Sequence, residues 1–343
     1  MGSTALDYSV LSKRRNDLFG MAIVSIVIFH FCAESNVAAS KIYCALVGSV
    51  GVPIFLMLSG MGLFFSMSKN AGIGQFYKKR LVRVLIPYVI VAGVHFLVRY
   101  IIIEGKGFVD WLRGMFFVDF ITKRDTQFWF IALILVMYLV FPLLFKLFKS
   151  GKLNFLKLFI LCGVVVAANF ALSKYAPVLY KNIEIMLTRI PAFLIGVYFG
   201  EKVYNKRPVQ LPFWLISILG GAAFVYIGIM RSVVGVKFLL DIVRYGETLY
   251  ALLIVMVLSI LLEAINSAGF SKICAFFGGM SLELYMVHVS LRTIMGDIGF
   301  AKDNILYYAV MAIISVGVSF ALQKFDGFVT KKLTAPKAAK TAS

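Results

Sequence analysis

The chain has 343 residues, of which 61% are hydrophobic and only 15% are charged, and its mean hydropathy is +0.92. Soluble domains usually carry about 25% charged residues, so this composition excludes an ordinary soluble protein and predicts an all-α polytopic membrane protein. The net charge of +19 could suggest nucleic-acid binding, but in a membrane protein Lys and Arg mark cytoplasmic loops, and no nucleic-acid partner is expected.

Apolar runs of about 20 residues predict about ten transmembrane helices. They cover 17–35, 42–67, 84–103, 127–147, 154–173, 186–204, 211–230, 247–265, 276–295 and 304–323. We expect three parts, which are an N-terminal tail over 1–13, a membrane domain over 14–325, and a short Ala- and Lys-rich tail over 326–343 that is disordered. An even number of helices puts both termini on the same side.

The basic residues indicate which side that is. They cluster in alternate short connections (Lys13, Arg14 and Arg15; Lys69, Lys78, Lys79, Arg80 and Arg83; Lys146, Lys149 and Lys152; Lys202, Lys206 and Arg207; Lys272; Lys324, Lys331, Lys332, Lys337 and Lys340). This alternation predicts that both termini are cytoplasmic. On the opposite face, 104–126 and 231–247 are either surface-lying loops or a rim that orients a polar, lipid-linked acceptor, and the sequence leaves both interpretations open.

The first span, RRNDLFGMAIVSIVIFH, carries a histidine deep inside an apolar run. Fifteen residues of helix place His30 roughly 22 Å beyond Arg15, where a titratable group is costly and therefore a functional candidate. His288 lies about 18 Å into the ninth span, at a similar depth. We expect these two imidazoles to face each other or a water-filled cavity. The remaining histidine, His95, is expected to be structural.

The connection GIGQFYKKRLVRVLIPY places Lys79, Arg80 and Arg83 at the predicted cytoplasmic mouth. Two interpretations stay open, which are anchoring to lipid phosphates and binding of a phosphate-rich cytosolic donor, because arginine forks match phosphate oxygens. Charge alone favours anchoring. The four cysteines show no metal-ligand spacing, and no metal site is predicted.

Six segments together resemble the integral-membrane acyltransferases of acyltransferase family three. In order they are RRNDLFGMAIVSIVIFHF, GVPIFLMLSG, FYKKRLVRVLIPY, FWFIALILVMYLVFPLL, RIPAFLIGVYFG and GGMSLELYMVHVSL, which extend over residues 14 to about 290. The resemblance implies transfer of an acyl group, typically acetyl from acetyl-CoA, to a hydroxyl of an envelope polysaccharide or glycolipid precursor. The family's basic residue eleven positions before the first histidine is here Phe19, and Arg14 or Arg15, one turn earlier, is its expected substitute.

Burial and resemblance together give a set of expected roles. We expect His30 to be the general base, because a neutral imidazole can accept the proton of an attacking hydroxyl, and Glu34, one turn beyond it, could orient its ring. The remaining candidates are grouped by role (catalytic: His288; donor-binding: Arg14, Arg15, Asp17, Lys79, Arg80, Arg83 and Arg189; acceptor side: Trp129, Glu283, Tyr285 and Arg292).

The expected partners are acyl-CoA as a co-substrate, a glycan or lipid-linked sugar as acceptor, and membrane lipids. No bound cofactor is expected. The resemblance implies a multi-pass protein of a bacterial plasma membrane. The first alternative function is an ion- or proton-coupled transporter, because buried His, Glu and Arg residues also form ion relays. The second is a structural or flippase-like lipid scaffold.

Overall fold

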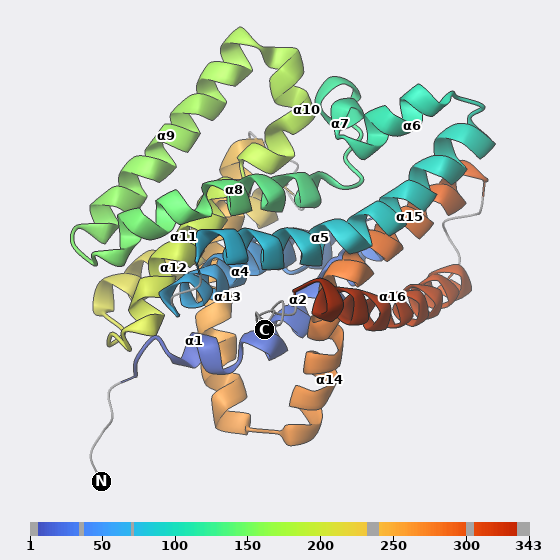
Figure 1. Cartoon of the computed structure of the whole chain (residues 1–343). Helices are drawn as coiled ribbons and strands as arrows, with labels where there is room; N and C mark the ends of the chain where they lie inside the picture. Colours follow the sequence, from blue (N-terminus) through green and yellow to red (C-terminus); the bar gives the residue numbers. More distant parts are fainter. Residues whose placement is uncertain (1–5, 34–37, 70–71, 232–239, 300–304, 335–343) are drawn as a thin grey trace, which may run out of the picture.

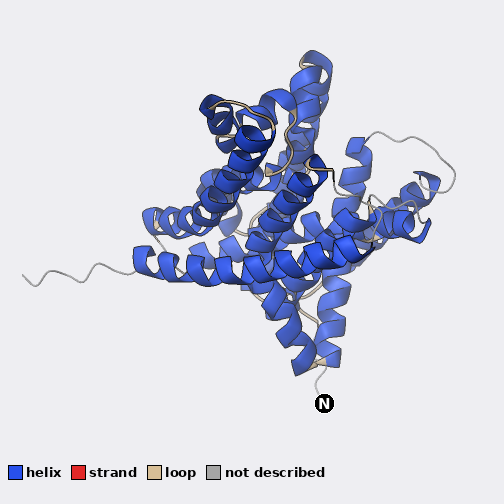
Figure 2. Ribbon diagram, turned by 90° about the vertical axis from the view of Figure 1, so that its right-hand side faces the viewer, coloured by secondary structure: helices blue, strands red, loops and turns tan. Residues whose placement is uncertain are grey.

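The computed structural model describes residues 6–33, 38–69, 72–231, 240–299 and 305–334. Within these ranges every regular element is a helix, and nine helices are long and apolar enough to cross a membrane, or ten if α14 and α15 form one bent span. The prediction of an all-α polytopic protein with about ten membrane helices is therefore confirmed. Figures 1 and 2 show the bundle in two perpendicular views. The cytoplasmic placement of the termini stays a prediction.

The helices follow one another with short connections. In chain order they are α1 (Val10–Lys13), α2 (Arg15–Cys32), α3 (Ala38–Leu46), the 3₁₀ turn η1 (Gly48–Val50), α4 (Gly51–Ser68), α5 (Ile73–Phe96), the π-helical η2 (Leu97–Ile103), α6 (Phe108–Met115), α7 (Val118–Lys123), α8 (Trp129–Lys149), α9 (Asn154–Tyr175), α10 (Pro177–Leu187), α11 (Ile190–Tyr204), α12 (Leu211–Ile229), α13 (Leu240–Ile265), α14 (Ala268–Gly279), α15 (Ser281–Asp297) and α16 (Ile305–Thr334).

Two helices extend beyond the apolar runs that predict them. Helix α5 begins at Ile73, so its basic motif and its membrane-spanning part belong to one continuous helix. Helix α16 continues to Thr334, so residues 326–334 are helical rather than part of a disordered tail, and 335–343 lie outside the described residues. Hydropathy identifies only the part of a helix that lies in lipid, so it misses a polar extension. In the last turn of α16, the positive charges of Lys331 and Lys332 interact favourably with the negative end of the helix dipole and so stabilise this extension.

The predicted span 276–295 is broken. Helices α14 and α15 meet at a bend of 63° beside Gly278 and Gly279, and paired glycines are a common cause of a sharp kink. Helix α14 packs closely on α2, where a Cβ atom added at Gly20 would overlap the backbone carbonyl of Cys274. The bend turns α15 away from α14, so that α15 packs against α5 and α16.

The centre of the molecule and its periphery differ in burial. Helices α2, α4, α8, α11 and α15 contribute many fully buried side chains, including Ile23, Leu56, Leu133, Phe193 and Met286. By contrast, in the most apolar stretch of 18 residues, only 11% of the residues of α9 and 17% of those of α16 are buried inside the protein. These two outer helices have the exposure expected of lipid-facing segments, and α9 lies at the edge of the bundle (Figure 1).

Candidate active site

The two deep histidines meet inside the bundle. Nδ1 of His30 on α2 lies 2.8 Å from Nε2 of His288 on α15, and the ring centroids are 5.1 Å apart. His288 is 1% exposed, whereas His30 is half-buried. The two histidines are more than 250 residues apart in the chain, yet they lie at the same depth in the bundle, as the similar depths counted from the sequence predict.

The hydrogen bonds of this histidine pair fix where the ring protons lie. Nδ1 of His288 is 2.6 Å from the backbone carbonyl of Leu284, which can only accept, so this nitrogen carries a hydrogen. In a neutral ring the opposite nitrogen, Nε2, is then an acceptor, and Nδ1 of His30 donates to it. A neutral His30 therefore keeps its lone pair on Nε2, the nitrogen that can accept a proton.

A cavity of about 390 Å³ lies between these helices, on the side toward the N-terminus of α2. Its volume falls within the ~300–1,000 Å³ that small-molecule sites usually have. The walls combine apolar side chains with polar groups, which lie at one end and near Tyr285. The lining residues that matter below are Arg15, Phe19, Ile26, Arg80, Arg83, Phe130, Tyr138 and Tyr285.

Three arginines form the polar end of the cavity. Arg15 of α2 and Arg80 and Arg83 of α5 line it together with the hydroxyl-bearing Tyr138. In the described part of the chain, none of the three forms an ion pair with a carboxylate. Because each guanidinium offers several donors in a planar fork, the group is suited to an anion such as a phosphate.

The structure distinguishes the two candidates for the basic residue missing at Phe19. The guanidinium of Arg15 lies over the Phe19 ring, 4.7 Å from its centroid, and lines the cavity. Arg14 instead points to the turn between α13 and α14, where it bonds Glu263 at 2.9 Å and Asn266 at 2.7 Å. Of the two, Arg15 is therefore the one that adds its positive charge to those of Arg80 and Arg83 at this end of the cavity.

Two other residues predicted to bind the donor are not among the residues that line the cavity. Asp17 is buried and accepts a hydrogen bond of 2.9 Å from Ser271, so it fastens α2 to α14. Lys79 is exposed on the first turns of α5. Glu34, the expected partner of His30, lies outside the described residues.

The opposite end of the cavity approaches the histidine pair. Ile26 and Tyr285 line it, and they precede His30 and His288 by four and three residues on the same helices. One helical turn, about 5 Å, therefore separates the cavity wall from the imidazoles. The Tyr285 hydroxyl donates to the backbone carbonyl of Gln127 at 3.0 Å, and its ring lies 6.2 Å from that of His288.

The other acceptor-side candidates surround this end without lining the cavity. Trp129 begins α8 and packs edge-on against Phe130, which does line it. Glu283 is buried in the first turn of α15, and Arg292 lies one turn beyond His288 on the same helix.

Arg189 belongs to a separate buried cluster. It forms an ion pair with Glu247 of α13, and Glu184 and Arg244 form a second ion pair beside it. These side chains join the α10–α11 junction to α13, and Arg189 is not among the residues that line the cavity. The sequence could not supply this partner, because it lies 58 residues away on a helix whose rotation is set by packing.

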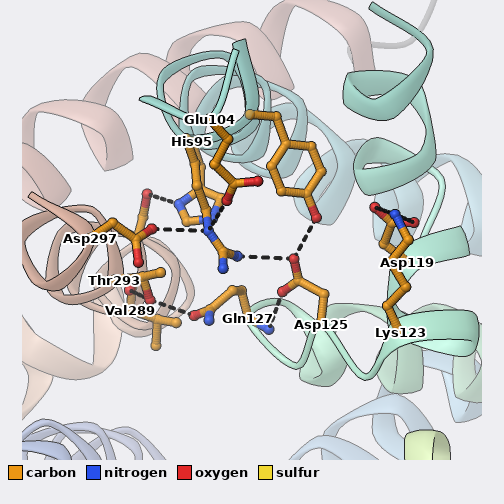
Figure 3. A network of polar contacts seen from close by, with 12 residues as sticks. His95, Glu104, Asp119, Lys123, Asp125, Gln127, Val289, Thr293 and Asp297 are labelled. Atoms are coloured by element: carbon orange, nitrogen blue, oxygen red, sulfur yellow. Dashed lines mark hydrogen bonds and ion pairs between the residues drawn. The ribbon is translucent and has the colours of Figure 1, made fainter. Parts of the chain in front are cut away.

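A polar network at the far end of α15 was not predicted (Figure 3). Arg99 of η2 contacts Asp125 at 3.1 Å, Asp297 at 3.0 Å and Glu104 at 3.3 Å. Gln127 accepts from Thr293 at 2.7 Å, so the loop before α8 is held against α15. The signal available in the sequence is the concentration of acidic residues in 104–126.

The other buried polar groups at this end are structural. His95 is fully buried and 2.8 Å from the Ser290 hydroxyl, in keeping with its expected structural role. Asp119 is also buried. Burial alone would raise its pKa, but hydrogen bonds from Arg113 and Lys123 outweigh this effect and hold the pKa of Asp119 below its usual value.

Comparisons with known proteins agree with this arrangement. A family model described as "Acyltransferase domain" matches residues 20–324. The chain is 22% identical over 307 residues to "Putative acetyltransferase ORF330" of Acidianus two-tailed virus, an alignment that covers 87% of this chain and 89% of that protein. Comparison with solved structures gives no match. The matched range covers most of the chain and includes the histidine pair, Arg80 and Arg83, so the chain belongs to acyltransferase family three and is a membrane acyltransferase.

Proposed function

We propose that this acyltransferase moves an acyl group, acetyl in the simplest case, from cytosolic acyl-CoA to a hydroxyl of an envelope polysaccharide or glycolipid precursor. One observation carries the proposal. A single cavity has, at one end, three arginines that form no ion pair with a carboxylate in the described residues, and its other end lies one helical turn from the histidine pair. This is the shape required by a donor with phosphates at one end and a thioester at the other.

The arginines hold the donor in this proposal. Arg15, Arg80 and Arg83 bind its phosphates, because planar guanidinium groups bind phosphate oxygens in pairs. Arg15 and His30 are fifteen residues apart on α2, which is roughly 22 Å along the axis. The flexible arm of CoA spans this interval along walls that include Phe19 and Phe130 and brings the thioester toward the histidines.

His30 acts as the general base. Its Nε2 accepts the proton of the acceptor hydroxyl as the oxygen attacks the thioester carbon. The new bond joins that oxygen to the acyl carbon, the carbon–sulfur bond breaks, and the leaving thiolate takes the proton back from His30. His288 touches neither substrate in this scheme, and it orients the base through the hydrogen bond to Nδ1 of His30.

The two substrates reach the site from opposite sides. The arginine end lies beside the connection predicted to be cytoplasmic, where acyl-CoA is found. The acceptor approaches from the side of 104–126, whose short amphipathic helix α6 exposes Phe108 and Val109 as an interfacial helix does. In this proposal the protein works in the plasma membrane of a cell with an acylated envelope.

The proposal is tested with the purified protein in lipid nanodiscs, acetyl-CoA, and an envelope-glycan extract. CoA release and mass spectrometry of the glycan report the transfer. We expect His30→Gln to lose at least about a hundredfold in transfer rate with donor binding retained, because an amide cannot accept the proton. His95→Gln is the matched control and should keep its activity, since His95 bonds Ser290 away from the pair. Transfer by His30→Gln at near the wild-type rate would refute the assignment.

A further inference from the structure

A second, smaller cavity adjoins the first. Its volume is about 220 Å³, and it is lined by Leu11, Ser12, Lys13, Arg15, Asn16, Met61, Gly62, Phe65 and Val203. Alone it is smaller than the ~300–1,000 Å³ typical of a small-molecule site. Arg15 and Asn16 line both cavities, however, so the second continues the first beyond the arginine end.

Arg15 forms the boundary between the two cavities. Its Nε donates to the backbone carbonyl of Leu58 at 3.1 Å, which holds the guanidinium against α4. Gly62, one turn further along α4, leaves the space that the guanidinium occupies, because a Cβ atom there would overlap it. The charge of Arg15 is therefore available to a ligand that extends from one cavity into the other.

The lining of the second cavity combines a positive charge with a flat apolar surface. Phe65 supplies an aromatic ring, which is supported by Tyr204 at a centroid distance of 5.5 Å, and Met61 adds an apolar side chain. Lys13 stands at the exposed rim, where it pairs with Glu263 at 3.1 Å. Aromatic rings stack on nucleobases regardless of their identity, and cations bind the attached phosphates.

We propose that the second cavity holds the nucleotide head of the acyl-CoA donor, with its base against Phe65. The pyrophosphate then lies at Arg15 between the cavities, and the acyl-bearing arm runs through the first cavity toward His30. This assignment rests on the proposed function, because it presupposes an acyl-CoA donor. It makes Phe65 a specificity residue that distinguishes acyl-CoA from donors that lack the nucleotide.

The test compares acetyl-CoA with S-acetyl-4′-phosphopantetheine, which keeps the thioester arm and one phosphate but lacks the nucleotide. In the Phe65→Ala variant, kcat/KM for acetyl-CoA should fall roughly tenfold, the scale of one lost base–aromatic stack. The kcat/KM for S-acetyl-4′-phosphopantetheine should stay at the wild-type value. Phe159→Ala, on the exposed face of α9, is the matched control and should change neither.

A second variant guards against a folding defect. Ser12 is exposed at the rim, so Ser12→Trp narrows the second cavity without touching the core, and it should lower kcat/KM for acetyl-CoA alone. If both variants affect the two donors equally, or affect neither, while the wild type uses acetyl-CoA, the nucleotide does not lie in this cavity. A wild-type protein that turns over neither donor would instead overturn the proposed function, and this inference with it.

Discussion

The histidine pair permits a sharp test of how the base is held. Nε2 of His288 accepts the hydrogen bond from Nδ1 of His30, and this bond selects the His30 tautomer whose lone pair is on Nε2. Replacing His288 by Leu removes the acceptor at similar side-chain bulk and leaves the N–H of His30 without its partner. Replacing His288 by Gln keeps an acceptor, because the side-chain amide oxygen reaches about the position of Nε2.

The magnitude follows from the burial of this hydrogen bond. Nδ1 of the half-buried His30 faces His288, which is 1% exposed, so the substituted leucine leaves this donor against an apolar side chain in the interior, which costs about 1–3 kcal/mol. If the correctly oriented tautomer is destabilised by that amount, kcat falls by about 5- to 150-fold in His288→Leu. We expect His288→Gln to recover a large part of this loss. The KM for acetyl-CoA should not change in either variant, because the arginines that hold the donor lie at the other end of the cavity.

The assay is steady-state transfer by both variants in nanodiscs, with thermal unfolding measured in parallel. Equal melting temperatures of the Leu and Gln variants, combined with a clear difference in kcat, would identify His288 as a positioning residue rather than a packing residue. The reasoning is refuted if the two variants have the same kcat at equal stability, or if His288→Leu raises the KM for acetyl-CoA while leaving kcat intact.

Two further predictions separate donor binding from structure. Arg15→Ala should raise the KM for acetyl-CoA by about tenfold to over a hundredfold, the scale of a lost charge-assisted contact. Arg14→Ala should instead lower the melting temperature and leave that KM unchanged, because Arg14 bonds Glu263. Both variants are compared by steady-state kinetics and thermal unfolding, and the opposite pattern would contradict the placement of Arg15. Arg189→Ala should destabilise the protein by about 3–5 kcal/mol, because it leaves the buried Glu247 unpaired. The double variant Arg189→Met/Glu247→Met should restore much of the stability, which denaturation of both variants in detergent measures. A fully stable single variant would count against a buried pair.

Much of the architecture is determined by the sequence. A helix must present about 20 apolar residues to cross a bilayer, and this requirement is local, so runs such as 127–147 predict helices such as α8 with small errors at the ends. The depth of a residue along its helix is local as well. The similar depths of His30 and His288 can therefore be derived from residue counts, and the structure places the two rings in contact.

The direction in which a side chain points around a helix is decided by packing. Arg14 and Arg15 differ by about 100° of rotation on α2, and the sequence cannot tell which one faces the cavity. The close approach of α14 at Gly20 sets that rotation, turning Arg14 toward Glu263 and Arg15 toward the cavity. The 63° bend between α14 and α15 is equally hidden, because hydropathy does not respond to direction.

Partners that are distant in the chain also belong to the tertiary structure. The pairing of Arg189 with Glu247 and the shared position of Arg15 between two cavities both depend on helices that meet only after assembly. Apolar composition determined that the chain crosses the membrane, because lipid contact imposes a requirement on each segment separately. Only the packed bundle decided which polar groups face one another, because each such contact depends on the position and rotation of two helices together.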